Sequence, residues 1–219
     1  MTTINTGTET VQRVPVQPAA EAAPPAAIGD PAMIGLPAFI VGSVAFGLVL
    51  VRYVPSAAAG ASLAIIIAAT GLGLVIAAVW SAAVGQSAVA GVFGIFAGFW
   101  LSYALLALGL THNWFGVGAG VAVRTQGLFL ISWLVIFGML TLATLRLPVA
   151  YTVLFALIEV ALVLVLTGIM QDAPNVLFIA GVVVFVFAAV AAYLFFNSAS
   201  QATGGRTLPL GPPLLHVHG

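Results

Sequence analysis

The stretch Asp30-Pro-Ala-Met-Ile-Gly-Leu-Pro-Ala-Phe39 decides the fold, because it opens the first long apolar segment of the chain. Asp caps a helix N-terminus well, and Pro suits the first helical position, where no N–H is needed. From Met33 to Val54 the only charged side chain is Arg52. About 20 apolar residues in a helix cross a hydrocarbon core of roughly 30 Å. We therefore predict a transmembrane helix that begins here.

The composition places the whole chain in a membrane. Of its 219 residues, 63% are hydrophobic and 5% are charged, whereas about 25% are charged in soluble domains. The formal net charge is zero, which gives no electrostatic basis for binding nucleic acid. The absence of cysteine excludes disulfides and thiolate chemistry.

Five more apolar runs follow the first one, so the sequence predicts an all-α bundle of six transmembrane helices. This domain covers residues 30–197, with spans at 33–54, 61–80, 88–110, 127–145, 149–170 and 176–196. Residues 1–29 are rich in Thr, Pro, Ala and Gln, a composition that cannot bury a core, and we expect a disordered tail. Residues 198–219 are expected to form a C-terminal tail.

An even number of spans places both termini on one side of the membrane. Three arginines (Arg13, Arg146 and Arg206) then lie on the side of the termini, against Arg52 and Arg124 on the other. Because basic residues favour the cytoplasmic side, we expect a multi-pass protein of the cell membrane with cytoplasmic termini.

Small residues recur every fourth position in two of the spans, at Ala69, Gly73, Ala77 and Ser81 and at Ala90, Gly94, Gly98 and Ser102. Such rows let helix backbones approach closely in lipid. The rows favour either packing within one subunit or a contact between subunits.

No catalytic constellation occurs in the sequence. It contains no nucleophile elbow, no phosphate-binding loop and no dinucleotide fingerprint in a strand–helix context. His216 and His218 near the end of the chain have no carboxylate or cysteine close to them in sequence, so we expect no metal site. An enzyme is not expected, and neither is a cofactor.

Glu159 is the one acidic residue deep inside a predicted span. Charges at this depth are costly, so such residues usually face a cavity or a partner. Arg146 lies about 20 Å away along the helix and cannot pair with it. Two interpretations stay open: a role in proton coupling, or a structural carboxyl bonded to hydroxyls of other spans, such as Ser102, Ser132 or Thr141.

Two motifs resemble the acetate uptake transporter family of six-span membrane proteins. The family's Asn-Pro-Ala-Pro-Leu-Gly-Leu motif matches this chain at Pro31, Ala32, Gly35 and Leu36, and its closing Gly-Arg-Thr-x-Leu-Pro-Ile-Gly segment resembles Gly204–Gly211. Gly98-Phe-Trp-Leu101 and Trp133 also fit the family pattern. The chain departs from it at Asp30, where the family has Asn, and at Met33, where it has Pro.

The resemblance implies a homo-hexamer in which each subunit carries small carboxylates, such as acetate or succinate, with protons across the bilayer. It also implies an apolar constriction, which the motif alignment places at Phe39, Phe96 and Ile158, next to Glu159. We expect a continuous passage beside Phe39 and Phe96. The rest of the pathway is placed at the start of the first helix, on Asp30, Pro31, Ala32, Met33, Gly35 and Leu36, where free N–H groups would attract an anion.

Two other functions stay open from the sequence. A channel for a small neutral solute, such as urea, a short amide or ammonia, would suit an apolar constriction equally well. A membrane assembly protein that transports nothing would need the rows of small residues for packing alone.

Overall fold

The computed structural model describes residues 29–215, apart from the side chains of Ser56 and Ala57. In this part of the chain, six helices are long and apolar enough to cross a membrane. Five of them are nearly continuous α-helices: α1 (Ala32–Leu50), α4 (Ser87–Thr111), α5 (Ala119–Ala143), α6 (Val149–Met170) and α7 (Pro174–Ala202). The single-turn η3 (Thr144–Arg146) extends α5. The prediction of six helical spans is confirmed, whereas the predicted N-terminal tail, apart from Gly29, and His216 and His218 lie outside the described residues.

The second span is less regular than the others. It runs through a 3₁₀ segment, η1 (Ser56–Ala61), a short α2 (Ser62–Ile65), a π-helical segment, η2 (Ile66–Gly71), and α3 (Leu72–Ala83). A π-turn inserts an extra residue into the helix. Here it presents the buried Thr70 to α1, while Ala69 of the predicted small-residue row is exposed.

Five helices, α1, α3, α4, α6 and α7, end in the same way. In each, the N–H of the third residue past the helix bonds to the carbonyl five residues earlier, and the residue before it has a positive φ. This is the Schellman arrangement, which satisfies the last carbonyl groups of a helix. The residues with positive φ are Arg52, Gly85, Asn113, Asp172 and Gly204.

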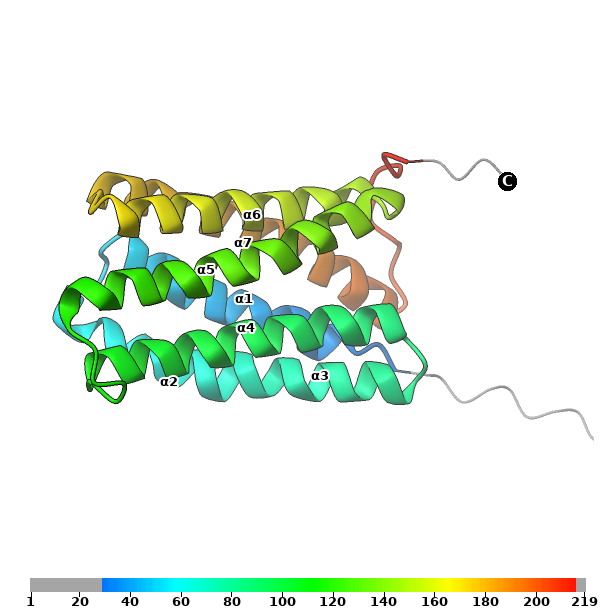
Figure 1. The fold of residues 1–219 in the computed structure, drawn as a ribbon. Coiled ribbons are helices and arrows are strands. Elements are labelled where there is room, and N and C mark those ends of the chain that lie inside the picture. The colour runs from blue at the N-terminus through cyan, green and yellow to red at the C-terminus, as the bar shows by residue number, and fades with distance from the viewer. Residues whose placement is uncertain (1–28, 216–219) are drawn as a thin grey trace, which may run out of the picture.

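The six spans run side by side (Figure 1), and their contacts close them into a ring. Helix α1 packs against α7 and α3, α6 packs between α5 and α7, and α4 packs against α3 and α5. Gly29 and the C-terminal segment lie at the same end of the bundle, as an even number of spans requires. The ring leaves a central axis onto which side chains from several helices converge.

Close approach between helices depends on glycine at a few positions of α1. A methyl group at Gly42 would overlap Thr70, and one at Gly35 would overlap the ring of Phe93 on α4. Packing of this kind holds helices together in lipid, where the hydrophobic effect does not. Gly73 of the second span lies against Ala38 on α1. This member of the predicted row of small residues therefore packs within the subunit.

Two predicted boundaries differ by more than five residues from the observed helices. Helix α5 begins at Ala119 rather than at Gly127, because Gly118 is extended and the following residues, including Arg124, are helical although they are too polar to be recognised as a span. Helix α7 continues past the predicted end at Phe196 to Ala202.

The segment 203–215, which we call the C-terminal strap, then folds back over the end of the bundle (Figure 1). The N–H of Leu208 donates to Oδ1 of Asn197 at 2.8 Å, and the Tyr193 hydroxyl donates to the Pro209 carbonyl at 2.8 Å. The N–H of Ala150 on α6 donates to the Leu210 carbonyl at 3.1 Å. The strap therefore ties the end of α7 to the start of α6.

Candidate functional site

The three residues expected at a constriction come together on the central axis. Phe39 of α1, Phe96 of α4 and Ile158 of α6 line one small cavity of about 20 Å³. All three are buried, and the rings of Phe39 and Phe96 meet edge to face with centroids 4.8 Å apart. The motif alignment therefore placed three residues from distant parts of the chain at one point, although their role in permeation stays a prediction.

More aromatic rings pack around the constriction than the sequence analysis identified. The rings of Phe137 and Phe155 lie 5.0 and 5.7 Å from that of Phe96, and the ring of Phe187 lies 5.7 Å from that of Phe39. These residues come from α5, α6 and α7. In spans that are apolar on all sides, nothing in the sequence separates an axis-facing Phe from a lipid-facing one.

The larger of two vestibules lies on the side of the described chain ends and has a volume of about 570 Å³. Asp30, Ala32, Leu36 and Phe39 are among its lining residues, as expected for the start of the pathway. Other helices add polar groups to its wall, from Gln86, Thr144, Tyr151, Asn197, Ser198 and Gln201.

Three predicted pathway residues lie outside this wall. Pro31 is fully buried, Gly35 is buried against the ring of Phe93, and Met33 is half-buried without lining the vestibule. Successive residues of a helix point in different directions, so only some residues at the start of α1 can face the vestibule.

The backbone amides at the start of α1 are not free, contrary to expectation. The Asp30 carboxylate Oδ1 accepts the N–H of Ala32 at 2.9 Å, and the N–H of Met33 donates to the Asp30 carbonyl at 3.0 Å. Asp30 thus acts as the predicted helix cap, and its carboxylate occupies the donor that an incoming anion would need.

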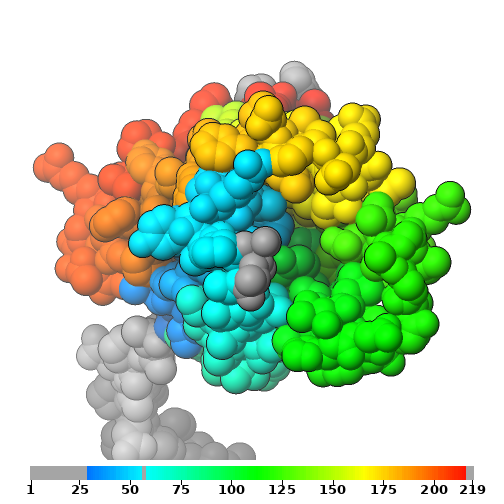
Figure 2. Space-filling view, turned by 90° about the vertical axis from the view of Figure 1, so that its left-hand side faces the viewer, coloured from blue at the N-terminus to red at the C-terminus, as the bar shows by residue number. Residues whose placement is uncertain are grey.

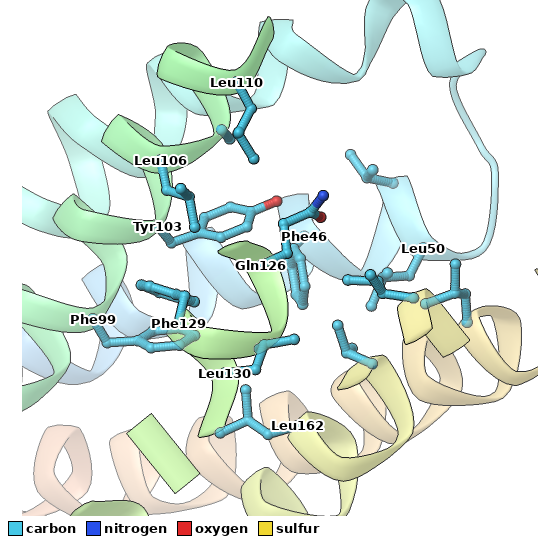
Figure 3. Close-up of a pocket in the computed structure, with 15 residues that line it drawn as sticks. Phe46, Leu50, Phe99, Tyr103, Leu106, Leu110, Gln126, Phe129, Leu130 and Leu162 are labelled. Atoms are coloured by element: carbon cyan, nitrogen blue, oxygen red, sulfur yellow. The ribbon is translucent and has the colours of Figure 1, made fainter. Parts of the chain in front are cut away.

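The second vestibule, of about 220 Å³, lies at the opposite end, between α1, α4, α5, α6 and α7. Its wall is apolar except for the side chains of Tyr103 and Gln126, whose polar ends are directed into the same space (Figure 3). Seen from this end, the molecule has a central hollow bordered by the segments around residues 50–65, 110–126 and 165–177 (Figure 2).

The two vestibules are separated by the packed rings of the constriction. Its 20 Å³ cavity has room for about one water molecule and is too small for acetate. The expected continuous passage beside Phe39 and Phe96 is therefore absent from this conformation of the described residues. Passage of a solute requires the rings to move.

Glu159 does not line any of these three cavities. It follows Ile158 in α6 and is turned by about 100° from it, toward α5, where a methyl group at Gly138 would lie 3.3 Å from its Oε1. Oε1 is buried and has no hydrogen-bond partner in the described part of the chain.

The hydroxyl partners expected for Glu159 bond elsewhere. Ser102, Ser132 and Thr141 each donate to the carbonyl four residues earlier in their own helix, at 2.6, 2.8 and 2.9 Å. A hydroxyl in an apolar helix finds this acceptor locally, which is why the interhelical bonds do not form. Within residues 29–215, no cluster of three or more potential metal ligands occurs.

Comparisons with known proteins agree with the architecture. The model of the GPR1/FUN34/yaaH family matches residues 13–207 of the chain. A solved structure described as the bacterial acetate channel SatP superposes with a TM-score of 0.73 at 22% sequence identity, covering 84% of this chain and 99% of that one. No curated protein matches the sequence.

Proposed function

Because the chain belongs to the GPR1/FUN34/yaaH family of acetate uptake transporters, we propose that it is a membrane permease for small carboxylates such as acetate or succinate. The family consists of transporters and channels, so the chain is not an enzyme. The observation that carries the proposal is the hourglass along the axis: two vestibules at opposite ends, of about 570 and 220 Å³, meet at the apolar constriction of Phe39, Phe96 and Ile158.

Electrostatics limits the form in which an acid passes this constriction. Moving an isolated carboxylate into an apolar environment costs tens of kcal/mol by Born solvation. A free carboxylic acid titrates near Glu, at about 4.3, so roughly one molecule in 500 is neutral at pH 7. The acid therefore passes either with a proton or in contact with water and hydrogen-bond donors.

We propose Glu159 as the proton-exchanging group, acting from beside the constriction rather than within it. Its position next to Ile158 and its buried, unpartnered Oε1 support this role. Asp30, Ala32, Leu36 and Phe39 line the route to the constriction from the larger vestibule, and Pro31, Met33 and Gly35 shape the helix that carries them.

The assembly and orientation proposed for the protein are a homo-hexamer in the cell membrane with cytoplasmic termini. The exposed apolar side chains along α3 and α5, such as Val79, Leu128 and Met139, provide surface for lipid or for neighbouring subunits. Cross-linking in native membranes tests the hexamer, and protease access to the termini in sealed vesicles tests the orientation.

The decisive experiment measures uptake of labelled acetate, succinate and urea into proteoliposomes, with and without an inward proton gradient. Saturable acetate uptake that a protonophore dissipates supports the carboxylate permease. A matched pair of variants shows whether flux follows the central axis: Ala161→Phe fills the constriction, whereas Ala156→Phe places the same ring on the exposed side of the same helix.

A second candidate function is a channel for a small neutral solute, because apolar groups form nearly the whole constriction. It predicts urea or ammonia flux that does not saturate and does not depend on a proton gradient. Flux of none of these solutes would contradict both candidates and leave an assembly protein.

A further inference from the structure

Two polar side chains interrupt the apolar wall of the smaller vestibule. Tyr103 of α4 and Gln126 of α5 are among its lining residues, and the others are Phe, Leu, Val, Ile or Ala. This described part of the wall has no charged side chain. An apolar cavity with a few convergent polar groups is the usual form of a site for a small molecule.

Both polar groups are available to a ligand. Their ends are directed into the same space of the vestibule (Figure 3). The Gln126 Nε2 lies 3.5 Å from the Ala122 carbonyl, at the outer limit of a hydrogen bond. Among the tyrosines of the described residues, only Tyr193 has a hydroxyl that bonds to the protein, so the Tyr103 hydroxyl is left without a protein partner.

The Tyr103 ring is held in place by its aromatic neighbours. It meets the ring of Phe46 edge to face with centroids 5.3 Å apart, and it lies nearly parallel to the ring of Phe99 at 6.5 Å. The ring of Phe129 is 6.3 Å away. Because these contacts fix the ring, little conformational freedom is lost when its hydroxyl binds a solute.

The vestibule is accessible from the end of the bundle, where the molecule has a central hollow (Figure 2). Its volume is about 220 Å³, and one water molecule needs roughly 10–15 Å³ of such space. The vestibule therefore has room for a solute of several heavy atoms.

We propose that Tyr103 and Gln126 form a binding site for the carboxyl group of a short monocarboxylic acid. This inference rests on the proposed transport of small carboxylates and narrows their class. The Tyr103 O–H and the Gln126 Nε2–H are two donors for the two oxygens of one carboxylate. The alkyl part of the acid lies against the apolar wall, where its removal from water is favourable.

The composition of the wall predicts selectivity. A second carboxylate, as in succinate, finds no polar partner there, and urea would place its N–H groups against the same apolar side chains. Burying a polar or charged group without a partner is costly. We therefore expect propionate to inhibit uptake of labelled acetate at concentrations on the order of tenfold lower than succinate or urea, the effect of one unpaired polar group.

The test removes each polar group while keeping the size of its side chain. In proteoliposomes, Tyr103→Phe and Gln126→Met should each raise the acetate concentration for half-maximal uptake by about tenfold, the effect of one hydrogen bond to a charged acceptor. The matched controls Tyr53→Phe and Gln171→Met make the same changes at exposed positions that do not line the vestibule. They should leave this concentration unchanged.

A second readout measures binding without transport. In detergent solution, saturation transferred by NMR from the protein to the acetate methyl protons reports contact with the wall of the vestibule. The signal should be lost in the double variant Tyr103→Phe, Gln126→Met and kept in the double control, with size-exclusion chromatography showing equal assembly.

The outcomes separate the proposed site from the proposed function. If all variants take up acetate with the same half-maximal concentration and the NMR signal persists in the double variant, the site is wrong while the transport function stands. Inhibition by succinate as strong as that by propionate would overturn the monocarboxylate selectivity. If the unmodified protein carries no acetate, the proposed function is wrong, and loss of the NMR signal in the double variant alone would still support the site.

Discussion

The rings of Phe39 on α1 and Phe96 on α4 meet edge to face with centroids 4.8 Å apart, and this contact closes the axis between the two vestibules. The residues are 57 positions apart in sequence (96 − 39). Because each ring blocks the other's side of the axis, the size of a solute that passes depends on how far the two can separate.

The change Phe39→Ala is expected to admit larger acids. Removing the ring opens the constriction, so flux of butyrate should rise relative to acetate in proteoliposomes. Core Phe→Ala changes cost about 3–5 kcal/mol, so thermal unfolding in detergent should occur at a lower temperature. The control Phe196→Ala removes a ring that is 64% exposed at the end of α7 and should alter neither quantity. An unchanged ratio of butyrate to acetate flux in the Phe39 variant would place the permeation route elsewhere.

The change Glu159→Gln tests the proposed proton exchange. Gln keeps the size of the side chain but cannot carry a proton between the two sides of the membrane. We expect gradient-driven acetate uptake to fall by about a hundredfold or more, the range typical when a proton-transfer group is lost, while size-exclusion chromatography shows unchanged assembly. Equal uptake at every pH would remove Glu159 from the mechanism and leave it a structural carboxyl facing α5.

The change Asn197→Ala is expected to loosen the C-terminal strap. Asn197 is 7% exposed, and its side chain holds the Leu208 N–H at 2.8 Å. Loss of one such bond typically costs about 1 kcal/mol, which should appear as a lower unfolding temperature and as faster proteolysis between residues 203 and 215. Asn175→Ala, an exposed position at the other end of α7, is the comparison variant. Equal proteolysis rates in both variants would mean that the strap does not depend on Asn197.

The change Gly42→Ala is expected to destabilise the contact between α1 and the second span. The added methyl group overlaps Thr70, and overpacking of this kind typically costs about 1–3 kcal/mol. Gly91→Ala adds the same group to α4, where no atom lies within 4 Å of it, and should be neutral or stabilising. Unfolding in a denaturant series in mild detergent compares the two. If the Gly42 variant were as stable as the Gly91 variant, the contact between α1 and the second span would not require glycine at position 42.

The sequence predicted the spans well because hydrophobicity alone marks them. Its clearest failure is the start of α5: Ala119 to Gln126 contains Arg124 and glycine, so hydropathy falls there even though the backbone is already helical. A helix can extend beyond the hydrocarbon core, and composition does not register that extension.

The site was predictable where a motif fixed the position and not elsewhere. Phe39 lies a few residues after the N-terminal motif, so alignment of the motifs could place it, and the same alignment placed Phe96 and Ile158. Phe137, Phe187 and Trp100 were not identified as axis-facing, because which side of an apolar helix faces the axis is decided by helix packing. The free amides expected at Ala32 and Met33 were wrong for a local reason, since Asp30 uses them.

Leu210 of the C-terminal strap makes two kinds of contact. Its carbonyl accepts a hydrogen bond from the Ala150 N–H, and its side chain lines the larger vestibule. A shortened chain that ended at Ala202 would keep all six spans but lose part of the wall of the larger vestibule. A reporter fused directly after the last helix would therefore report the orientation of the spans correctly. The same fusion would alter the larger vestibule, so it is unsuitable for measuring transport. Such fusions are better joined after Leu215.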